Sequence, residues 1–188
     1  SNNGELYYRL GMVLLADEQY AASQRALESA INRGGMESKD TGDAWLLLGT
    51  ARFSQAGPED TRIWGRAREA FVNAQRFSNS RRRASDWITY IDAVVTAYWD
   101  GRKLEYQQNL DACKDDIARF ERDQRIRDLQ NREASAEEVE QQQARLGECK
   151  ALEEAGPPSR NRSSAPAEDE AESAPEEATT EEDASTNE

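Results

Sequence analysis

Few side chains in this sequence could take part in chemistry. It has no histidine, which is the usual general base and a frequent metal ligand. Cys113 and Cys149 are far apart in the sequence, so they form neither a CxxC redox motif nor a zinc-binding pair. Adjacent carboxylates such as Asp115 and Asp116 lie in highly charged segments, where a solvated surface is their expected role. We therefore predict no catalytic residues, no cofactor and no metal site, so the chain is not expected to be an enzyme.

The two cysteines point instead to a link between two helices. Apolar residues recur at alternating spacings of four and three through residues 102–131, which is the pattern of a seam for one partner helix. These residues are Tyr106, Leu110, Cys113, Ile117 and Phe120. Ser135 begins a capping box that predicts a second helix, which ends before Gly156. In an antiparallel hairpin that bends at Asn131, Cys113 lies opposite Cys149.

A disulfide between Cys113 and Cys149 is the interpretation that this hairpin favours, and two unrelated free thiols are the alternative. The hairpin has few other apolar contacts, so its stability would depend on the bond. A disulfide requires an oxidising compartment, which in a bacterium is the periplasm. We therefore expect a periplasmic location, with any association with the membrane made through partners.

The elements that precede the hairpin follow a pattern that occurs twice. In each copy a large aromatic residue is followed by Leu-Gly, then by a second aromatic residue and small residues. The first copy is Tyr7, Leu10, Gly11, Tyr20, Leu27 and Ala30, and the second is Trp45, Leu48, Gly49, Trp64, Ala67, Phe71 and Ala74. This is the skeleton of a tetratricopeptide repeat (TPR), a pair of packed helices. We predict one pair over residues 4–37 and a second that starts near Asp43, with a turn of unusual length at residues 54–60.

Three parts of the chain follow from these patterns. We expect an all-α fold in which residues 1–101 form a TPR-like α-solenoid of two helix pairs plus a capping helix, from Ala84 to about Trp99. Residues 102–155 are predicted to form the charged antiparallel helical hairpin. Residues 156–188 are predicted to be a disordered acidic tail, because they contain neither an aromatic nor a branched aliphatic residue.

Overall charge and hydropathy exclude two classes of partner. The formal net charge of -13 argues against binding to nucleic acid, which requires a basic surface. No apolar run approaches the roughly 18 residues that a membrane-spanning helix needs. The sequence begins without Met, so we expect a processed or excised fragment, in which a missing signal peptide is uninformative.

The register of the repeats predicts which side chains face the concave surface. They are Tyr8, Met12, Leu15, Asp43, Leu46, Thr50 and Phe53. This lining is mostly apolar and aromatic, and it lacks the Lys, Arg and Asn residues with which some repeat domains hold acidic chaperone tails. We expect a protein or peptide partner, with a hydrophobic or extended segment as the ligand. The alternative is that several of these residues pack on a preceding repeat.

Arg81, Arg82 and Arg83 form the only dense basic cluster. It is predicted to contact an acidic partner or the acidic tail of this chain through charge complementarity. An exposed loop near a helix terminus, with no binding role, is the alternative.

Residues 4–35, 43–57 and 68–93 resemble the last repeats of proteobacterial TPR proteins encoded beside TonB–ExbB–ExbD energy-transduction systems. In that family the final repeat is followed by an A-x-x-W-I-x-Y-I helix. The matching residues here are Ala84, Trp87, Ile88, Tyr90 and Ile91. The resemblance implies a periplasmic adaptor for TonB-dependent uptake, with TonB-system components as partners and no catalytic residues. The hairpin and the tail depart from that pattern, and the competing hypothesis is an assembly protein whose hairpin self-associates while the repeats act as a spacer.

Overall fold

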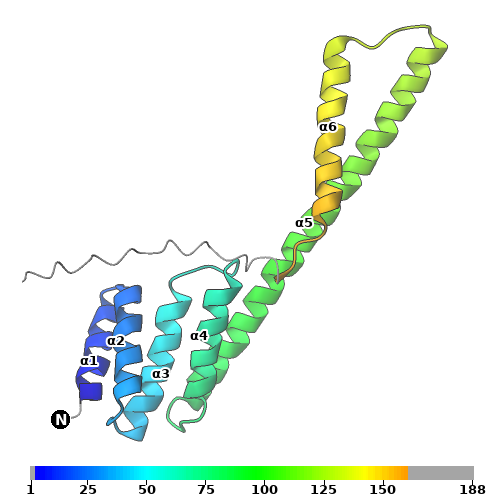
Figure 1. Cartoon of the computed structure of the whole chain (residues 1–188). Coiled ribbons are helices and arrows are strands. Elements are labelled where there is room, and N and C mark those ends of the chain that lie inside the picture. Colours follow the sequence, from blue (N-terminus) through cyan, green and yellow to red (C-terminus); the bar gives the residue numbers. More distant parts are fainter. Residues whose placement is uncertain (1–2, 161–188) are drawn as a thin grey trace, which may run out of the picture.

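The computed structural model describes residues 3–160, which fold into helices with no strand among them (Figure 1). The helices are α1 (Asn3–Ala16), α2 (Tyr20–Arg33), α3 (Ser38–Phe53), α4 (Thr61–Ala74), α5 (Arg81–Leu129) and α6 (Ala136–Ala155). Helices α1 to α4 lie side by side in chain order, and the first half of α5 continues the row (Figure 1). The fold is therefore all-α, as predicted. None of the helices in the described part of the chain has the length and apolar character needed to cross a membrane.

Local signals in the sequence account for several helix boundaries. The Asp60 carboxylate accepts a hydrogen bond from the backbone N–H of Ile63 at the start of α4. At the start of α6, Ser135 and Glu138 form the predicted capping box. Helix α2 is followed by Gly34, whose φ of 65° lies in the left-handed region that glycine adopts without strain.

Two glycines let the helices of each pair approach closely. A Cβ atom on Gly11 would lie 2.6 Å from the side chain of Leu27, and one on Gly49 would lie 2.6 Å from the ring of Phe71. Leu27 and Phe71 are both fully buried. The Leu-Gly element of the repeated pattern is thus a packing element, which brings α2 onto α1 and α4 onto α3.

The core consists of two clusters of buried side chains. The first joins α1, α2, α3 and α4 and contains Tyr8, Leu27, Ala30, Ala44, Leu48 and Ala70. The second joins α3, α4 and α5 and contains Leu46, Trp64, Ala67, Phe71, Ala74, Ala84, Ile91, Val95 and Trp99. The long turn between α3 and α4 packs on this second cluster through Ala56, whose carbonyl accepts a hydrogen bond from the Trp64 indole at 2.8 Å.

The predicted capping helix does not end near Trp99. Helix α5 runs without interruption from Arg81 to Leu129, so the capping helix and the first helix of the hairpin are one element. Gly101 lies inside it with open space around the position of a Cβ atom. A single interior glycine costs only about 1 kcal/mol relative to alanine, which the packing of Ile91, Val95 and Trp99 on the array outweighs.

Helix α6 folds back along the second half of α5 (Figure 1). The structure joins Cys113 to Cys149 in a disulfide with a Cα–Cα distance of 5.6 Å, and these are the only buried residues of α6 and of the second half of α5. Beside the disulfide, Arg145 Nε lies 2.9 Å from a carboxylate oxygen of Asp116. The chain turns at residues 130–135, where Asn131 has a φ of 48°. One disulfide and one ion pair are thus the main contacts between these helices.

Residues 156–160, which were predicted to be disordered, lie against α5. Pro158 and Tyr106 line one pocket, and the guanidinium of Arg160 donates a hydrogen bond to the Thr96 hydroxyl at 3.0 Å. The hydroxyl of Thr61, at the start of α4, lies 3.5 Å from the carbonyl oxygen of Arg160. This segment therefore follows α5 from the hairpin back to the array. The rest of the predicted acidic tail, residues 161–188, lies outside the described residues.

The substitution Gly49→Ala tests the close contact between α3 and α4. We expect it to lower the free energy of unfolding by about 1–3 kcal/mol, because the added methyl group must displace the buried Phe71 ring. Gly65→Ala is the matched control. Gly65 is also inside a helix but has open space around it, so alanine there should raise the free energy of unfolding by about 0.5–1 kcal/mol. Urea denaturation measures both, and a Gly49→Ala chain as stable as the native one would contradict the packing.

Replacing both Cys113 and Cys149 with alanine tests the hairpin. The disulfide closes a loop with a sequence separation of 36, for which the chain-entropy model gives about 3–4 kcal/mol. We expect the amides of α6 to lose protection against hydrogen exchange, while those of α1 to α4 keep theirs. Reduction of the native chain should have the same effect, and unchanged protection in α6 after both treatments would show that the hairpin does not depend on the bond.

Candidate functional site

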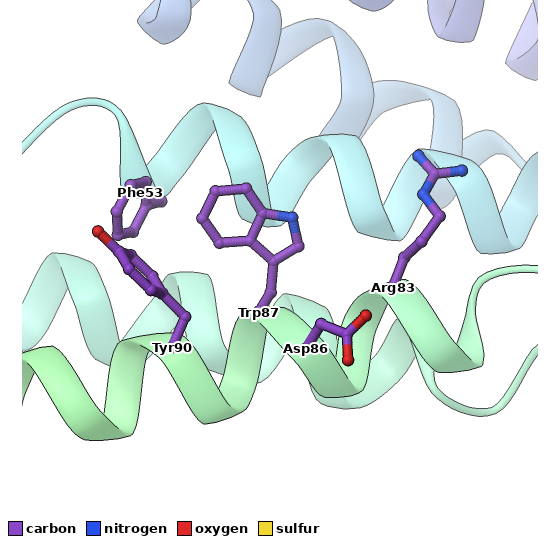
Figure 2. Close-up of a pocket in the computed structure, with 5 residues that line it drawn as sticks. All are labelled: Phe53, Arg83, Asp86, Trp87 and Tyr90. Atoms are coloured by element: carbon purple, nitrogen blue, oxygen red, sulfur yellow. The ribbon is translucent and has the colours of Figure 1, made fainter.

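The candidate site lies where α3 ends beside the first turns of α5. A groove of about 400 Å³ is lined there by Phe53, Arg83, Asp86, Trp87 and Tyr90 (Figure 2). All but Phe53 come from α5, where residues 83, 87 and 90 follow the spacing of one helix face. Figure 2 shows the three rings at one end of the groove and Arg83 at the other, with Asp86 between them. The site thus has an aromatic end and a charged end.

The aromatic end is held in place by ring contacts that continue into the core. The ring of Phe53 lies 5.0 Å from that of Trp87 and 6.0 Å from that of Tyr90, measured between centroids. Trp87 also stacks on the buried ring of Phe71 at 5.3 Å. Tyr90 keeps 52% of its surface exposed. The groove therefore presents aromatic side chains that are held by packing on the core and are partly exposed to solvent.

The charged end connects the groove to α1 and α3. The guanidinium of Arg83 lies 3.6 Å from the carboxylate of Asp43, which also accepts a hydrogen bond from the Asn79 side chain at 3.3 Å. Burial raises the pKa of Tyr8 on α1, and the negative charges of Asp43 and Asp40 raise it further. Asp43 of α3 and Arg83 of α5 thus form an ion pair, and Tyr8 of α1 lies within reach of their charges.

The residues predicted to line the groove divide into three groups. Phe53 lines it, and Asp43 reaches it through Arg83. Met12, Leu15 and Thr50 are partly exposed on α1 and α3 but do not contribute to this groove. Leu46 is corrected to a core residue, because it is only 2% exposed and packs in the same cluster as Trp64 and Phe71. Tyr8 is also mostly buried, at 9% exposed.

The three arginines predicted as one basic contact have different surroundings. Arg83 belongs to the groove. Arg81 donates a hydrogen bond through Nε to the carbonyl of Gln75, just after the end of α4, at 3.1 Å. Arg82 is exposed. The cluster therefore offers one side chain to the groove instead of three.

Asp86, Trp87 and Tyr90 line the groove although they were not among the predicted groove residues. The sequence places Trp87 and Tyr90 in the closing helix and in the A-x-x-W-I-x-Y-I signature, but not at the concave surface. The signal that identifies them is their spacing from Arg83, because residues separated by three or four positions share a helix face. The inward register of α1 and α3, continued into the first turns of α5, identifies them.

The charged groups of the site are one guanidinium and two carboxylates. Within residues 3–160, no group of three or more Cys, Asp and Glu residues is placed to hold a metal ion. Asp86 and Asp43 are the carboxylates at the charged end of the groove, and Asp43 is paired with Arg83 at 3.6 Å. What the arrangement can provide is an apolar contact area flanked by one cation and two anions.

The substitution Asp43→Asn tests whether α1 and α3 share this face. Removing the negative charge should lower the pKa of Tyr8, which should stay above its ordinary value because burial is the largest cause of the shift. The titration can be followed by NMR of the tyrosine ring carbons. Asp92→Asn is the control, since Asp92 pairs with Arg68 on α4 instead. An unchanged Tyr8 titration in Asp43→Asn would contradict the proximity.

Comparisons with known proteins give no further guide to identity. No family model, no curated protein and no solved structure matches the chain. What the protein binds must therefore be inferred from its own residues and their geometry.

Proposed function

We propose that this chain is a non-catalytic scaffold that binds a partner protein on the face formed by α1, α3 and the first turns of α5. The observation that carries the proposal is the groove of Phe53, Trp87 and Tyr90. Rings that are fixed by packing yet exposed give a large contact area at a small cost in side-chain entropy. For that reason Trp and Tyr are enriched among the residues that dominate protein interfaces.

The proposal includes a TPR-like α-solenoid for the array of helices. Its support is the repeated packing of a second helix over a glycine of the first, at Gly11 and at Gly49. In such arrays each unit contacts only its neighbours, and the inner faces of the first helices form an extended binding surface. The position of the groove beside the Asp43–Arg83 ion pair, which joins α3 to α5, supports a binding surface on this side of the array.

The best ligand for the groove is an extended segment with apolar side chains. The three rings suit an apolar side chain, while Arg83 and Asp86 can each bind a main-chain or side-chain polar group of the same segment. The groove is open and elongated along α5, so it favours a chain in an extended conformation (Figure 2).

We further propose that the protein is a periplasmic adaptor of a TonB system. The disulfide supports an oxidising compartment, since such bonds are rare in the bacterial cytoplasm. The A-x-x-W-I-x-Y-I signature supports the TonB association, and two of its residues, Trp87 and Tyr90, line the groove. The residues that carry the resemblance and those that carry the binding proposal thus overlap.

The substitution Tyr90→Ala tests the groove as a binding site. Tyr90 is exposed and lies outside the buried core, so its removal should leave the fold intact. We expect TonB-system components retained by the native chain from periplasmic extract to be retained about tenfold less by Tyr90→Ala. Leu129→Ala, at the exposed far end of α5, is the control and should bind as the native chain does. Equal retention by Tyr90→Ala would exclude the groove, and failure of the native chain to retain any TonB component would remove the specific role.

Self-association through the hairpin is the second candidate function. Its support is that Val139 and Leu146 on α6 remain 39% and 41% exposed, so the hairpin leaves part of its apolar surface uncovered. Sedimentation of the native chain over a range of concentrations separates the two candidates. An oligomer that is lost in the double variant Val139→Lys and Leu146→Lys would favour assembly, and a monomer throughout would favour the scaffold.

A further inference from the structure

The outer face of α1 carries an apolar ridge that no other part of residues 3–160 covers. Leu6, Leu10 and Val13 follow one another at spacings of four and three, and they are 67%, 46% and 65% exposed. Residues with this spacing lie on one face of a helix. Isolated exposed apolar side chains are ordinary, but three in a row along one helix face mark an interaction surface.

The internal repeat allows the ridge on α1 to be compared with the equivalent face of α3. A shift of 38 residues places α1 on α3, and it matches Gly4 with Gly42 and Gly11 with Gly49. The same shift matches Leu6, Leu10 and Val13 with Ala44, Leu48 and Ala51. These three residues of α3 are at most 1% exposed, and Ala44 and Leu48 pack in one cluster with Leu27 and Ala30 of α2. The ridge of α1 is therefore equivalent to the face of α3 that the preceding second helix covers.

The contacts at the covered face define the chemistry of a partner for the open one. On α3, Arg52 pairs with Glu28 of α2 at 2.9 Å, and Gln55 hydrogen-bonds Gln24 of α2 at 2.7 Å. The shift of 38 puts Leu14 in the place of Arg52 and Asp17 in the place of Gln55. A helix that covers α1 should therefore carry an apolar residue where α2 has Glu28, and a basic residue where α2 has Gln24.

The chain contains a helix with this surface. A shift of 44 residues places α2 on α4, and it matches Leu27 with Phe71, the two side chains that pack over the helix glycines. Under the same shift Gln24 corresponds to Arg68 and Glu28 to Val72. Second helices of this kind thus do occur with a basic and an apolar residue at the two positions.

We infer that the outer face of α1 is a docking surface for the second helix of a further helix pair of this same kind. That helix lies antiparallel to α1, places apolar residues on Leu6, Leu10 and Val13, and sets a basic residue of its first turns against Asp17. Helix α1 is consequently an interior element of a stack and not its end, because the end of a repeat array needs a polar outer face.

A tandem duplication tests the inference on the full chain. Residues 3–40 are repeated ahead of Asn3, and the added copy carries Gln24→Arg and Glu28→Val, so that its second helix is followed by the original α1 at the natural spacing. We expect the amides of the original α1 to exchange hydrogen at least tenfold more slowly than in the unduplicated chain. Leu10→Lys in the original α1 of the duplicated chain is the control, and it should restore most of the faster exchange. Unchanged exchange in the original α1 would overturn the inference.

A second measurement keeps the inference testable if the duplicated chain misfolds. A stapled peptide of residues 19–35 with Gln24→Arg and Glu28→Val, shown to be helical by circular dichroism, is added to the full chain. The peptide should change the NMR chemical shifts of Leu6, Leu10 and Val13 in the full chain. A control peptide that also carries Ile31→Lys should not change them. Shifts elsewhere, or none, would contradict the docking surface. A dimer of the full chain that Leu10→Lys abolishes and Leu129→Lys does not would overturn the proposed occupant in favour of a second copy.

Discussion

The structure depends on the packing of α3, α4 and α5 around Gly49, a residue that has no side chain. Because Gly49 has no Cβ atom, the Phe71 ring can lie directly on α3, and α4 is drawn in with it. The same ring supports Trp87, which stacks on it with an interplanar angle of 3°. Trp87 in turn positions Phe53 and Tyr90 at the groove. The arrangement of the candidate site is thus set by a packing requirement in the core.

The parts of the fold that could be predicted are those with a strong local signature. Glycines after leucine at matching places indicated the close helix contacts, and equal distances of the two cysteines from Asn131 indicated their pairing. The continuity of α5 could not be predicted from Gly101, because a glycine is a weak helix breaker and distant packing decides the outcome. The prediction that Leu46 lines the concave surface was wrong for a related reason. Register tells which way a side chain points, but only the position of α5 determines whether it is covered.

The hairpin and the array differ in what stabilises them. The array is held by two apolar clusters that extend through successive helices. The hairpin has the disulfide, the Asp116–Arg145 ion pair and a few half-buried apolar residues. Residues 156–160 connect the two by returning along α5 to Thr96 and Thr61. The second half of α5 is therefore supported at its base by the array and by this returning segment.

An uninterrupted helix has a mechanical consequence for whatever the groove holds. From Tyr90 to Cys113, α5 rises about 1.5 Å per residue, which places the disulfide about 35 Å from the groove along a single rod. A hinge between array and hairpin would let the two ends move independently, whereas a continuous helix transmits both distance and direction. Helix α5 would therefore act as a rigid spacer, and two proteins bound at the groove and at the hairpin would be held at a fixed distance.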